Sequence, residues 1–590
     1  MSARFKHWST ATVVVTGFLV AVAPAAGATT WRATSTKAMN LVSATRLGAL
    51  PGRRSLDVAL GLKVRNASGL AAFSKAVNTP GSSEFGHYLT PAQFTARYAP
   101  TKAQVAAVSK YLRSEGFTHV SVTSNRLYVT ADGTVSKAER AFHTSLFKFS
   151  QGGRTVFANT SAAEVPAKLS RTVLSVLGLN DSKLSTFGLP IKLPVSLPLN
   201  PKPLTLPAAA TNCQLDTSST TNLYGLCYYT PPEFRQAYDT GSLTGSDTTI
   251  AIMAEGDLTQ VVKDLRTAEK AFGEPQVPYT IVPVGVPSTD TSGEDEWDLD
   301  TQYSTGIART VKRLYIYDTT SLTDEDIGLE FNKFVSQDVA KAGSASFGEC
   351  EATPYADGLM VTNDEAMNEA AAQGQTMHAS SGDTGGQSCA VAPTNGAPES
   401  GLPEVNYPCS SPYVVCVGGT SLFTDADGSY EQEIGWIAGG GGVSTFEYSP
   451  YWQQCVVPSN AGENEARGVP DIAMDADENT GAEVYVDGSP ETVGGTSLSS
   501  PLALGSWSMM ETSAGNKLGF ASPLLYSLYP TTGCTSGVPA PQTSPLGAPY
   551  PFHDVYLGSN VAYPNTPGWD YVTGLGTYDV AKVAAALDKK

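Results

Sequence analysis

The stretch GEDEWDLD, residues 293–300, holds five acidic side chains at a spacing that suits proton transfer. On a helix of 3.6 residues per turn, Glu296 and Asp300 lie four residues apart and share one face. Tyr303 and Ile307 fall on that face too, so we predict that these two carboxyls are buried. Two buried carboxyls at this distance share a proton, which raises one pKa and gives a proton acceptor suited to acid conditions.

Glu294 and Asp298 form a second pair with the same spacing, on the opposite side of the predicted helix. They lie beside Thr305 and Arg309, so we predict that this pair faces solvent. The alternative for the whole stretch is an ordinary solvated acidic helix without chemistry.

A nucleophile for this proton acceptor is predicted in VGGTSLSSPLALGSWSMM, residues 493–510. Gly494 and Gly495 allow a sharp turn, and the small and apolar residues that follow predict a buried helix. Ser497 would lie in the first turn of that helix, near its positive end, which suits a nucleophile. A plain Gly-Ser turn with a helix cap is the alternative.

A serine nucleophile needs a base, and histidine is the usual one. The chain has six histidines, of which only His378 and His553 lie in the second, acidic part of the chain. Neither stands in a recognisable His-Gly-Thr motif. A carboxylate is therefore a serious candidate base, and His378 remains the alternative.

Alternating short apolar strands and helical stretches must position these residues. The strand-like segments TTIAIMAEG, RLYIYD, SASFGE and TMHASSGD each end on or near an acidic residue. This alternation predicts an α/β fold, a parallel sheet covered by helices. The active site of such a sheet lies at the carboxyl ends of the strands.

The chain has 590 residues, of which 41% are apolar and 16% charged, as expected for a globular protein of more than one domain. Residues 1–28 have the basic start, short apolar run and small-residue cleavage site of a signal peptide, so we expect a secreted protein. Once the signal peptide is removed, no membrane association is expected.

A proline-rich linker, residues 183–212, divides the exported chain into two parts of opposite charge. Residues 29–182 hold 19 Lys and Arg against 7 Asp and Glu, a net charge of +12. Residues 213–590 hold 14 against 49, a net charge of −35. Because the charges are opposite, we expect the two parts to dock. The basic part lacks the motifs of nucleic-acid readers, so no nucleic-acid partner is expected.

The basic part predicts a small α+β domain. SLDVALGLKV and VSVTSNRLYVTA alternate like strands. Two helices should begin after Thr90 and Thr101, and Gly116 should end the second. The eight cysteines all lie from residue 213 onward, and Cys213–Cys227 and Cys409–Cys416 are the disulfides expected first because they close short loops.

The motif GTS-x-x-x-P at 495–501, together with E-W-x-L-D at 296–300, resembles the sedolisins, the serine-carboxyl peptidases. HYLTPAQFTARYAPT (87–101) is similar to the activation prodomain of the kumamolisin type. Further blocks resemble the family in its order along the chain: YYTPPEFRQAYDTG (228–241), SSGDTGG (380–386), SSPYVVCVGGT (410–420), GGGGVSTFEYSPYWQ (439–453) and GVPDIAMDADENTG (468–481).

The resemblance implies a subtilisin-like fold for residues 213–590 and a ferredoxin-like activation prodomain at 29–182. It also implies that Ser497 is the nucleophile, Glu296 the general base and later acid, and Asp300 the residue that orients Glu296. Asp383 would supply the oxyanion hole. Such a carboxyl donates a hydrogen bond only while protonated, which agrees with acid action.

The C-terminal stretch FHDVYLGSN…PNTPGWDYVTGLGTYD resembles the calcium loop of the family. Asp554 and Asp570 would bind one structural calcium ion with their side chains. Val555, Thr566 and Gly568 would bind it with their carbonyl groups. Glycine is usual in the family where Thr566 stands, and the loop is short. His553 is expected to pack beside this site.

We therefore expect a secreted, acid-acting endopeptidase that is made as a zymogen and held by its own prodomain. Polypeptides are the expected substrates, and a monomer is expected. Residues 344–350 and 439–442 should form backbone walls of the cleft, against which an extended peptide adds a strand. The alternatives are a Ser/His/Asp subtilase that uses His378, and a secreted binding protein on an inactive protease scaffold.

Overall fold

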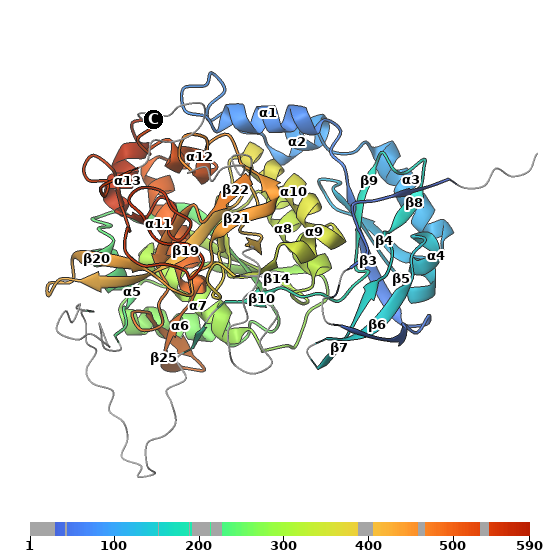
Figure 1. Ribbon diagram of the computed structural model, residues 1–590, viewed down its shortest axis with the longest axis horizontal. Helices are drawn as coiled ribbons and strands as arrows, with labels where there is room; N and C mark the ends of the chain where they lie inside the picture. The colour runs from blue at the N-terminus through green and yellow to red at the C-terminus, as the bar shows by residue number, and fades with distance from the viewer. Residues whose placement is uncertain are drawn as a thin grey trace, which may run out of the picture.

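The computed structural model describes most of the chain in two docked parts (Figure 1). The described residues are 30–39, 41, 44–151, 153–187, 189–190, 213, 227–387, 405–457, 466–531 and 542–590. The predicted signal peptide and most of the predicted linker lie outside them.

The basic part contains a four-stranded antiparallel sheet in the order β4-β5-β3-β9. Its elements in chain order are β3 (Ser55–Leu62), α3 (Lys102–Ser114), β4 (Thr118–Val122), β5 (Tyr128–Thr134), α4 (Val135–Ala141) and β9 (Val173–Leu177). Chain order and sheet order together give the ferredoxin-like arrangement, which confirms the predicted α+β prodomain.

Two predicted helix starts in this part are confirmed. Thr90 precedes α2 (Pro91–Arg97) and Thr101 precedes α3, and each forms a capping box with a glutamine three residues later. After α3 the chain reverses at Gly116, whose φ of +90° favours glycine. The other elements here are α1 (Ala67–Val77), β1 (Trp31–Ala33), β2 (Thr45–Ala49), β6 (Leu146–Gln151), β7 (Arg154–Asn159) and β8 (Glu164–Pro166).

The acidic part is built on one large sheet whose strands are parallel except for β20. Across the sheet the strands are β13 (Tyr279–Val284), β14 (Val311–Thr319), β12 (Gly245–Glu255), β15 (Ala342–Ala345), β17 (Thr376–Ser380), β19 (Val415–Thr424) and β20 (Tyr430–Gly435), with β23 (Ile472–Asp475) also paired to β19. The predicted parallel sheet is confirmed.

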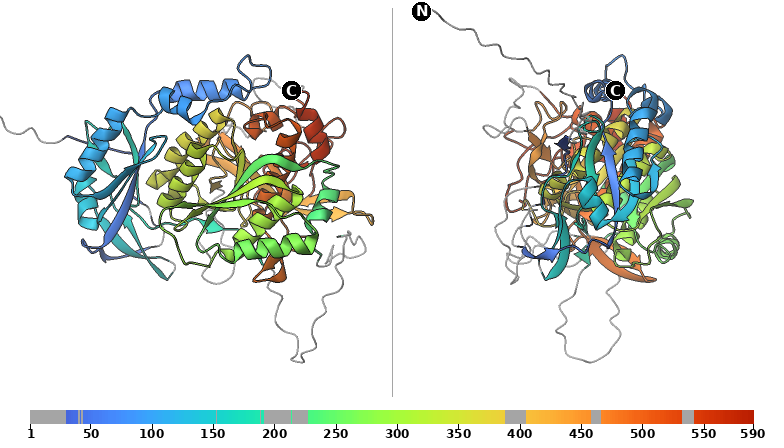
Figure 2. Two further views of the ribbon diagram at one scale, coloured as in Figure 1. Left: turned by 180° about the vertical axis from the view of Figure 1, so that it is seen from behind. Right: turned by 90° about the vertical axis from the view of Figure 1, so that its right-hand side faces the viewer.

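Helices pack on both sides of this sheet, with α6 (Val261–Phe272), α7 (Glu294–Ile307) and α11 (Thr496–Ser513) on one side and α8 (Asp324–Gln337) and α10 (Leu359–Gln373) on the other (Figure 2). The short helices are α5 (Pro231–Ala237), α9 (Ala352–Asp357), α12 (Ala521–Tyr526) and α13 (Val580–Leu587). The short strands are β10 (Ser185–Thr186), β11 (Leu189–Pro190), β16 (Phe347–Cys350), β18 (Asn406–Tyr407), β21 (Gly442–Tyr448), β22 (Ala466–Val469), β24 (Ala482–Val486), β25 (Ser489–Gly494), β26 (Phe552–His553) and β27 (Thr577–Tyr578).

Helices α11 and α7 pack directly against each other because Gly505 has no side chain. A Cβ at this position would collide with the Ile307 side chain and would lie 2.5 Å from the Ser304 carbonyl oxygen. The residues of α7 from Glu296 onward are all buried. The first turns of both helices therefore lie at one end of the sheet, held by packing along their whole length.

The prodomain docks on α8 and α10, and α1 lies across the top of α10 (Figure 1). Apolar side chains of the prodomain, among them Leu70, Phe94 and Tyr128, pack into the hydrophobic core of the acidic part. Hydrogen bonds add to this packing, such as Val64 N–H to Glu365 at 2.8 Å and Asn125 Nδ2 to Glu369 at 2.8 Å. No ion pair among the described residues joins the two parts. The parts do dock as expected, and the positive charge of Lys63 acts across the contact on Glu365.

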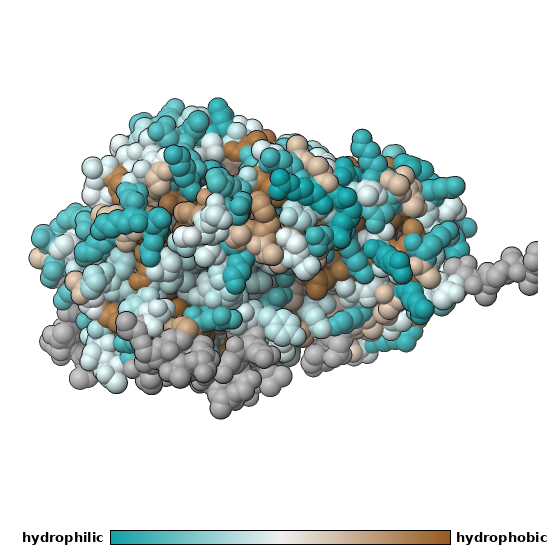
Figure 3. Space-filling model, turned by 90° about the horizontal axis from the view of Figure 1, so that it is seen from above, coloured by the Kyte–Doolittle hydropathy of each residue, from teal (hydrophilic) through white to brown (hydrophobic). Residues whose placement is uncertain are grey.

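Both disulfides expected from short loops are present, Cys213–Cys227 and Cys409–Cys416. Cys350 and Cys455 are disulfide-bonded as well. The face seen from above is mostly hydrophilic, with hydrophobic residues in small patches (Figure 3). In the part of the chain that the structure describes, no helix combines the length and apolar character needed to cross a membrane.

Candidate active site

Ser497 lies in the first turn of α11, directly after a turn that only glycine adopts easily. Gly495 has a φ of +103°. Ser497 is fully buried, and its hydroxyl donates to the carbonyl oxygen of Ser346 at 3.3 Å. The helix predicted from the sequence and the place of the serine in it are both observed.

Glu296 and Asp300 lie on α7 and are buried, as predicted. Ser346 Oγ donates to Oδ1 of Asp300 at 2.6 Å and also lies 3.4 Å from the Ser497 carbonyl oxygen. Burial raises the pKa of Asp300 well above its usual range, although the Ser346 hydrogen bond opposes this. Ser346 thus joins the acidic helix to the serine turn.

The prediction that Glu294 and Asp298 face solvent is wrong for Asp298, which is fully buried. Glu294 is half-buried. Helix α7 is covered by α11 and the sheet on one side and by α6 and β24 on the other. From Glu296 onward it therefore has no solvent-exposed face. Burial, and then the charges of neighbouring acids, raise the pKa of Asp298 to about 9.

Asp383 follows β17 and faces the start of α11. Its Oδ1 accepts hydrogen bonds from the backbone N–H and the hydroxyl of Thr496, at 2.9 and 2.8 Å. Oδ2 accepts none from the described residues. Burial raises the pKa of Asp383 to about 7, although the bonds from Thr496 oppose this. Below that pH the carboxyl is protonated and can donate a hydrogen bond.

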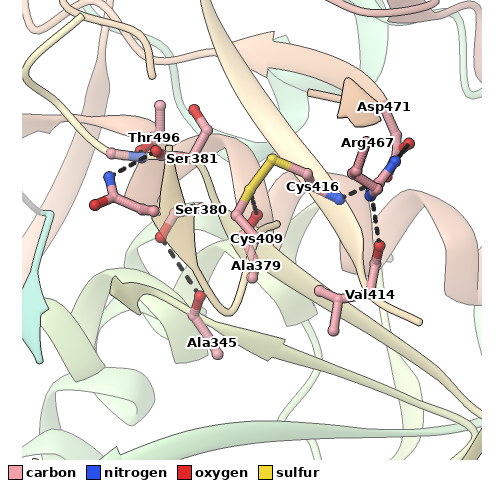
Figure 4. Close-up of a disulfide and its surroundings, with 12 residues drawn as sticks. Ala345, Ala379, Ser380, Ser381, Cys409, Val414, Cys416, Arg467, Asp471 and Thr496 are labelled. Carbon is pink, nitrogen blue, oxygen red and sulfur yellow. Dashed lines mark hydrogen bonds and ion pairs between the residues drawn. A yellow bond between two sulfur atoms is a disulfide. The ribbon is translucent and has the colours of Figure 1, made fainter. Parts of the chain in front are cut away.

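A disulfide braces β17, the strand that precedes Asp383 (Figure 4). Cys409 bonds to Cys416 at the start of β19, and its sulfur lies 3.4 Å from the Ala379 carbonyl oxygen of β17. Beside it, the backbone N–H of Gly382 donates to the Thr496 hydroxyl at 3.0 Å. The end of β17 is therefore held against the start of α11.

The described end of the linker runs through this site as an added strand. Strand β10 pairs antiparallel with β16, and β11 pairs antiparallel with the end of β25. Phe187 lies between them. A Cβ on Gly495 would collide with the Phe187 carbonyl oxygen and would lie 2.6 Å from Oδ2 of Asp383. The Phe187 carbonyl oxygen and the free oxygen of Asp383 therefore both lie against the turn before Ser497.

The Phe187 ring lies against two stretches of backbone. A Cβ on Gly348 would lie 3.0 Å from the ring, and one on Gly382 would lie 3.7 Å from it. The predicted wall at 344–350 is thus paired with a peptide strand, as expected. The other predicted wall, 439–442, contacts the residue before Asp383: the Gly440 N–H donates to the Gly382 carbonyl at 2.7 Å.

The two histidines of the acidic part do not contact Ser497 in the structure. His378 is buried in β17, where Nδ1 lies 3.2 Å from the Gly343 carbonyl oxygen. Its Nε2 has no hydrogen-bond partner among the described residues. Burial lowers the pKa of His378 to about 4. His553 stacks on Tyr430 with ring centroids 3.6 Å apart, beside the C-terminal loop.

The C-terminal loop brings the predicted calcium ligands together. Asp554 accepts from the Gly568 N–H at 3.0 Å, and Asp570 accepts from the Thr566 N–H at 2.8 Å. The Asn565 amide donates to the Val555 carbonyl at 3.1 Å and to Asp570 at 3.2 Å. Burial raises the pKa of Asp570 to about 7. Two carboxylates and nearby carbonyls are the oxygen ligands that Ca²⁺ prefers, so the residues fit that ion.

Two residues of the site were not predicted from the sequence. Ser346 stands inside SASFGEC, which was expected to provide only a backbone wall, and no local pattern marks its hydroxyl. Phe187 stands in the linker shortly before its first proline, Pro190, where a single aromatic residue gave no signal. Both positions depend on contacts between segments far apart in the chain.

Comparisons with known proteins agree with the fold. The family model described as Pro-kumamolisin, activation domain, matches residues 43–182. The chain is 35% identical over 587 residues to sedolisin from Pseudomonas sp. (strain 101), over 95% of this chain and 92% of that protein. It is 28% identical over 519 residues to kumamolisin from Bacillus sp. (strain MN-32), over 82% and 83% of the two chains.

Among solved structures, Pseudomonas sedolisin, a serine-carboxyl proteinase complexed with two molecules of pseudo-iodotyrostatin, matches with a TM-score of 0.55. The match is 34% identical and covers 62% of this chain and 99% of that chain. Likeness of sequence extends over nearly the whole length, from the activation domain to the C-terminal loop. The chain therefore belongs to the sedolisin family of serine-carboxyl peptidases and has the N-terminal activation domain of a zymogen.

Proposed function

We propose that this peptidase is a secreted endopeptidase that acts in acid, with Ser497 as nucleophile and Glu296 as general base. The observation that supports this most strongly is the position of the Phe187 carbonyl. It lies against Gly495, two residues before Ser497, and beside the free oxygen of Asp383. A peptide bond in that position lies at the turn that carries Ser497 and near a carboxyl that can donate a hydrogen bond.

In the proposed reaction, the Ser497 oxygen attacks the carbonyl carbon of the substrate while Glu296 accepts the hydroxyl proton. The tetrahedral intermediate then collapses, the C–N bond breaks, and Glu296 returns the proton to the leaving amine. Water repeats the two steps on the acyl-enzyme, with Glu296 again as base, and frees Ser497. Asp300 holds Glu296 in position.

Asp383 stabilises the oxygen that becomes negative in both steps. Its Oδ1 is occupied by Thr496, so its proton is on Oδ2, the oxygen that faces the Phe187 carbonyl. With a pKa of about 7, Asp383 keeps this proton in acid and loses it as the pH rises. The enzyme should therefore work below neutral pH, which is the basis for proposing acid action.

The linker in the site is the proposed first substrate. Phe187 has its ring against Gly348 and Gly382 and its carbonyl at Asp383, so the bond to the next residue, Gly188, is the one in position to be cut. The prodomain holds the linker there through its contacts with α8 and α10, and acts as an inhibitor of the same chain. Once this bond is cut, other polypeptides take its place.

We further propose one structural calcium ion in the C-terminal loop. Asp554 and Asp570 would bind it with carboxylate oxygens, and Val555, Thr566 and Gly568 with carbonyl oxygens. The ion would hold the loop together and would take no part in peptide hydrolysis. The signal-like residues 1–28 support secretion, and we propose that the mature enzyme is a monomer.

The test is a comparison of three purified full-length chains at acid pH: the wild type, Ser497→Ala and Glu296→Gln. The proposal expects self-processing and cleavage of a denatured protein by the wild type alone. If the enzyme were a subtilase that used His378 as base, the Glu296→Gln chain would still cleave. A binding protein on an inactive scaffold would show no cleavage by any of the three.

A further inference from the structure

Three carboxyls lie close together on the side of α7 that faces away from Ser497. Asp264 of α6, Glu294 at the start of α7 and Asp298 one turn later each offer one oxygen, and these oxygens all lie within 4.8 Å of one another. This is the second acidic pair of the GEDEWDLD stretch, joined by an acid from a neighbouring helix.

Asp298 is the residue that makes the cluster more than a surface patch. Its side chain is fully buried. Neither of its carboxylate oxygens accepts a hydrogen bond from any residue that the structure describes. A buried carboxylate without a partner is costly, and such groups in proteins are paired or coordinate a metal. One of these oxygens of Asp298 lies within 4.8 Å of the oxygens that Asp264 and Glu294 offer.

The charges around Asp298 are of one sign. Besides Asp264 and Glu294, the carboxylates of Asp295 and Asp487 act on it in the same sense. Two basic residues of α6 are engaged elsewhere. Arg266 pairs with Glu269 at 2.5 Å, and Lys263 donates to Gln260 at 3.2 Å. A cation from solution is the group that would balance this charge.

Asp264 is held in place for such a role. Its Oδ1 accepts from the Gly488 N–H at 2.8 Å, and its two oxygens accept from Gln260 Nε2 at 3.2 and 3.1 Å. Gly488 stands in the turn between β24 and β25 with a φ of +75°. Because these hydrogen bonds already fix the orientation of the carboxylate, little conformational entropy is lost when a metal ion binds to it.

We propose that Asp264, Glu294 and Asp298 form a binding site for a divalent cation of the calcium class, separate from the C-terminal loop. The ligands are all oxygen atoms, which calcium prefers, and water would complete its coordination shell. The cation would tie α6 and the β24–β25 turn to the back of α7. It would thereby hold the helix from which Glu296 and Asp300 project on the other side.

The test measures calcium binding to the full-length chain with Ser497→Ala, which cannot process itself. The chain is stripped with a chelator and titrated with calcium chloride in a calorimeter. Adding Asp298→Asn should lower the bound calcium by one ion per chain, whatever the C-terminal loop binds. The matched control is Asp295→Asn, which removes an acid from the same turn and should leave the number of ions unchanged.

Melting curves separate loss of a ligand from misfolding. In chelator, Asp298→Asn should melt no lower than its parent, because the neutral amide keeps the size of the carboxyl. In calcium, the parent should gain stability that Asp298→Asn does not gain. If Asp298→Asn does not fold, Glu294→Gln at the half-exposed ligand should show the same loss of one ion. An unchanged number of ions in these variants would overturn the proposal, and the three carboxyls would then share protons only.

Discussion

The hydroxyl of Ser346 donates a hydrogen bond of 2.6 Å to Oδ1 of Asp300. Since Ser346 also accepts the Ser497 hydroxyl at its carbonyl oxygen, one residue contacts both the acidic helix and the serine turn. The carboxyl that we propose to orient Glu296 is therefore itself held by a residue between β15 and β16.

Ser346→Ala should lower kcat while leaving KM nearly unchanged, because it loosens Asp300 without changing the peptide-binding backbone. A loss of about tenfold is expected, the equivalent of about 1.4 kcal/mol. Steady-state kinetics on a peptide substrate measure it. Ser344→Ala is the control, since the Ser344 hydroxyl bonds to Ser500 instead. Equal losses of kcat in both variants would show that the hydrogen bond to Asp300 makes no specific contribution to catalysis.

Activity should fall as the pH rises through about 7, because Asp383 then loses the proton that its proposed hydrogen bond to the oxyanion requires. The raised pKa sets the sign: the useful, protonated form is complete in acid and disappears above the pKa. A kcat profile from about pH 3 to about pH 9 measures this fall. Asp383→Ala should cost roughly 10²–10³ in kcat. Full wild-type activity well above pH 7 would contradict this role for Asp383.

Self-processing should cut the bond between Phe187 and Gly188. Mass spectrometry of the first fragments released in acid identifies the bond. Phe187→Asp should slow this cut by at least about tenfold, because a charge would be buried against Gly348 and Gly382. Phe187→Tyr keeps the ring and should be processed like the wild type. A first cut elsewhere in the linker, with Phe187→Asp processed normally, would refute the assignment.

Asp570→Ala should remove calcium-dependent stability from the C-terminal loop. At a calcium concentration a hundred times Kd, binding contributes roughly 2.7 kcal/mol to the free energy of unfolding. The measurement is the melting temperature with calcium and with chelator. The gain in calcium should be smaller in Asp570→Ala than in the wild type. If wild-type stability is the same in calcium and in chelator, the loop holds no structural calcium.

Much of the site could be predicted from the sequence because its key residues stand in local patterns. Helical spacing placed Glu296 and Asp300 together on a buried face, and the glycine turn located Ser497. The same spacing misjudged Asp298, because periodicity gives only the angle between residues on a helix. Whether a second layer covers the other face depends on α6 and β24, which are distant in the chain.

The contacts of Ser346 and Phe187 could not be predicted for a related reason. Each depends on the register between segments far apart in the sequence, β16 against α7 in one case and β10 against β16 in the other. The short-loop disulfides, by contrast, needed only proximity along the chain, and Cys213–Cys227 and Cys409–Cys416 were both found.

The most direct test of the account is self-processing of the full-length Glu296→Gln chain in acid. This substitution keeps the size of the side chain and removes its ability to accept a proton from Ser497. We expect the Glu296→Gln chain to stay intact, as the Ser497→Ala chain should, and the Asp295→Asn chain to be processed at the wild-type rate. A Glu296→Gln chain that still cuts its own linker would contradict the central claim that this carboxylate is the base.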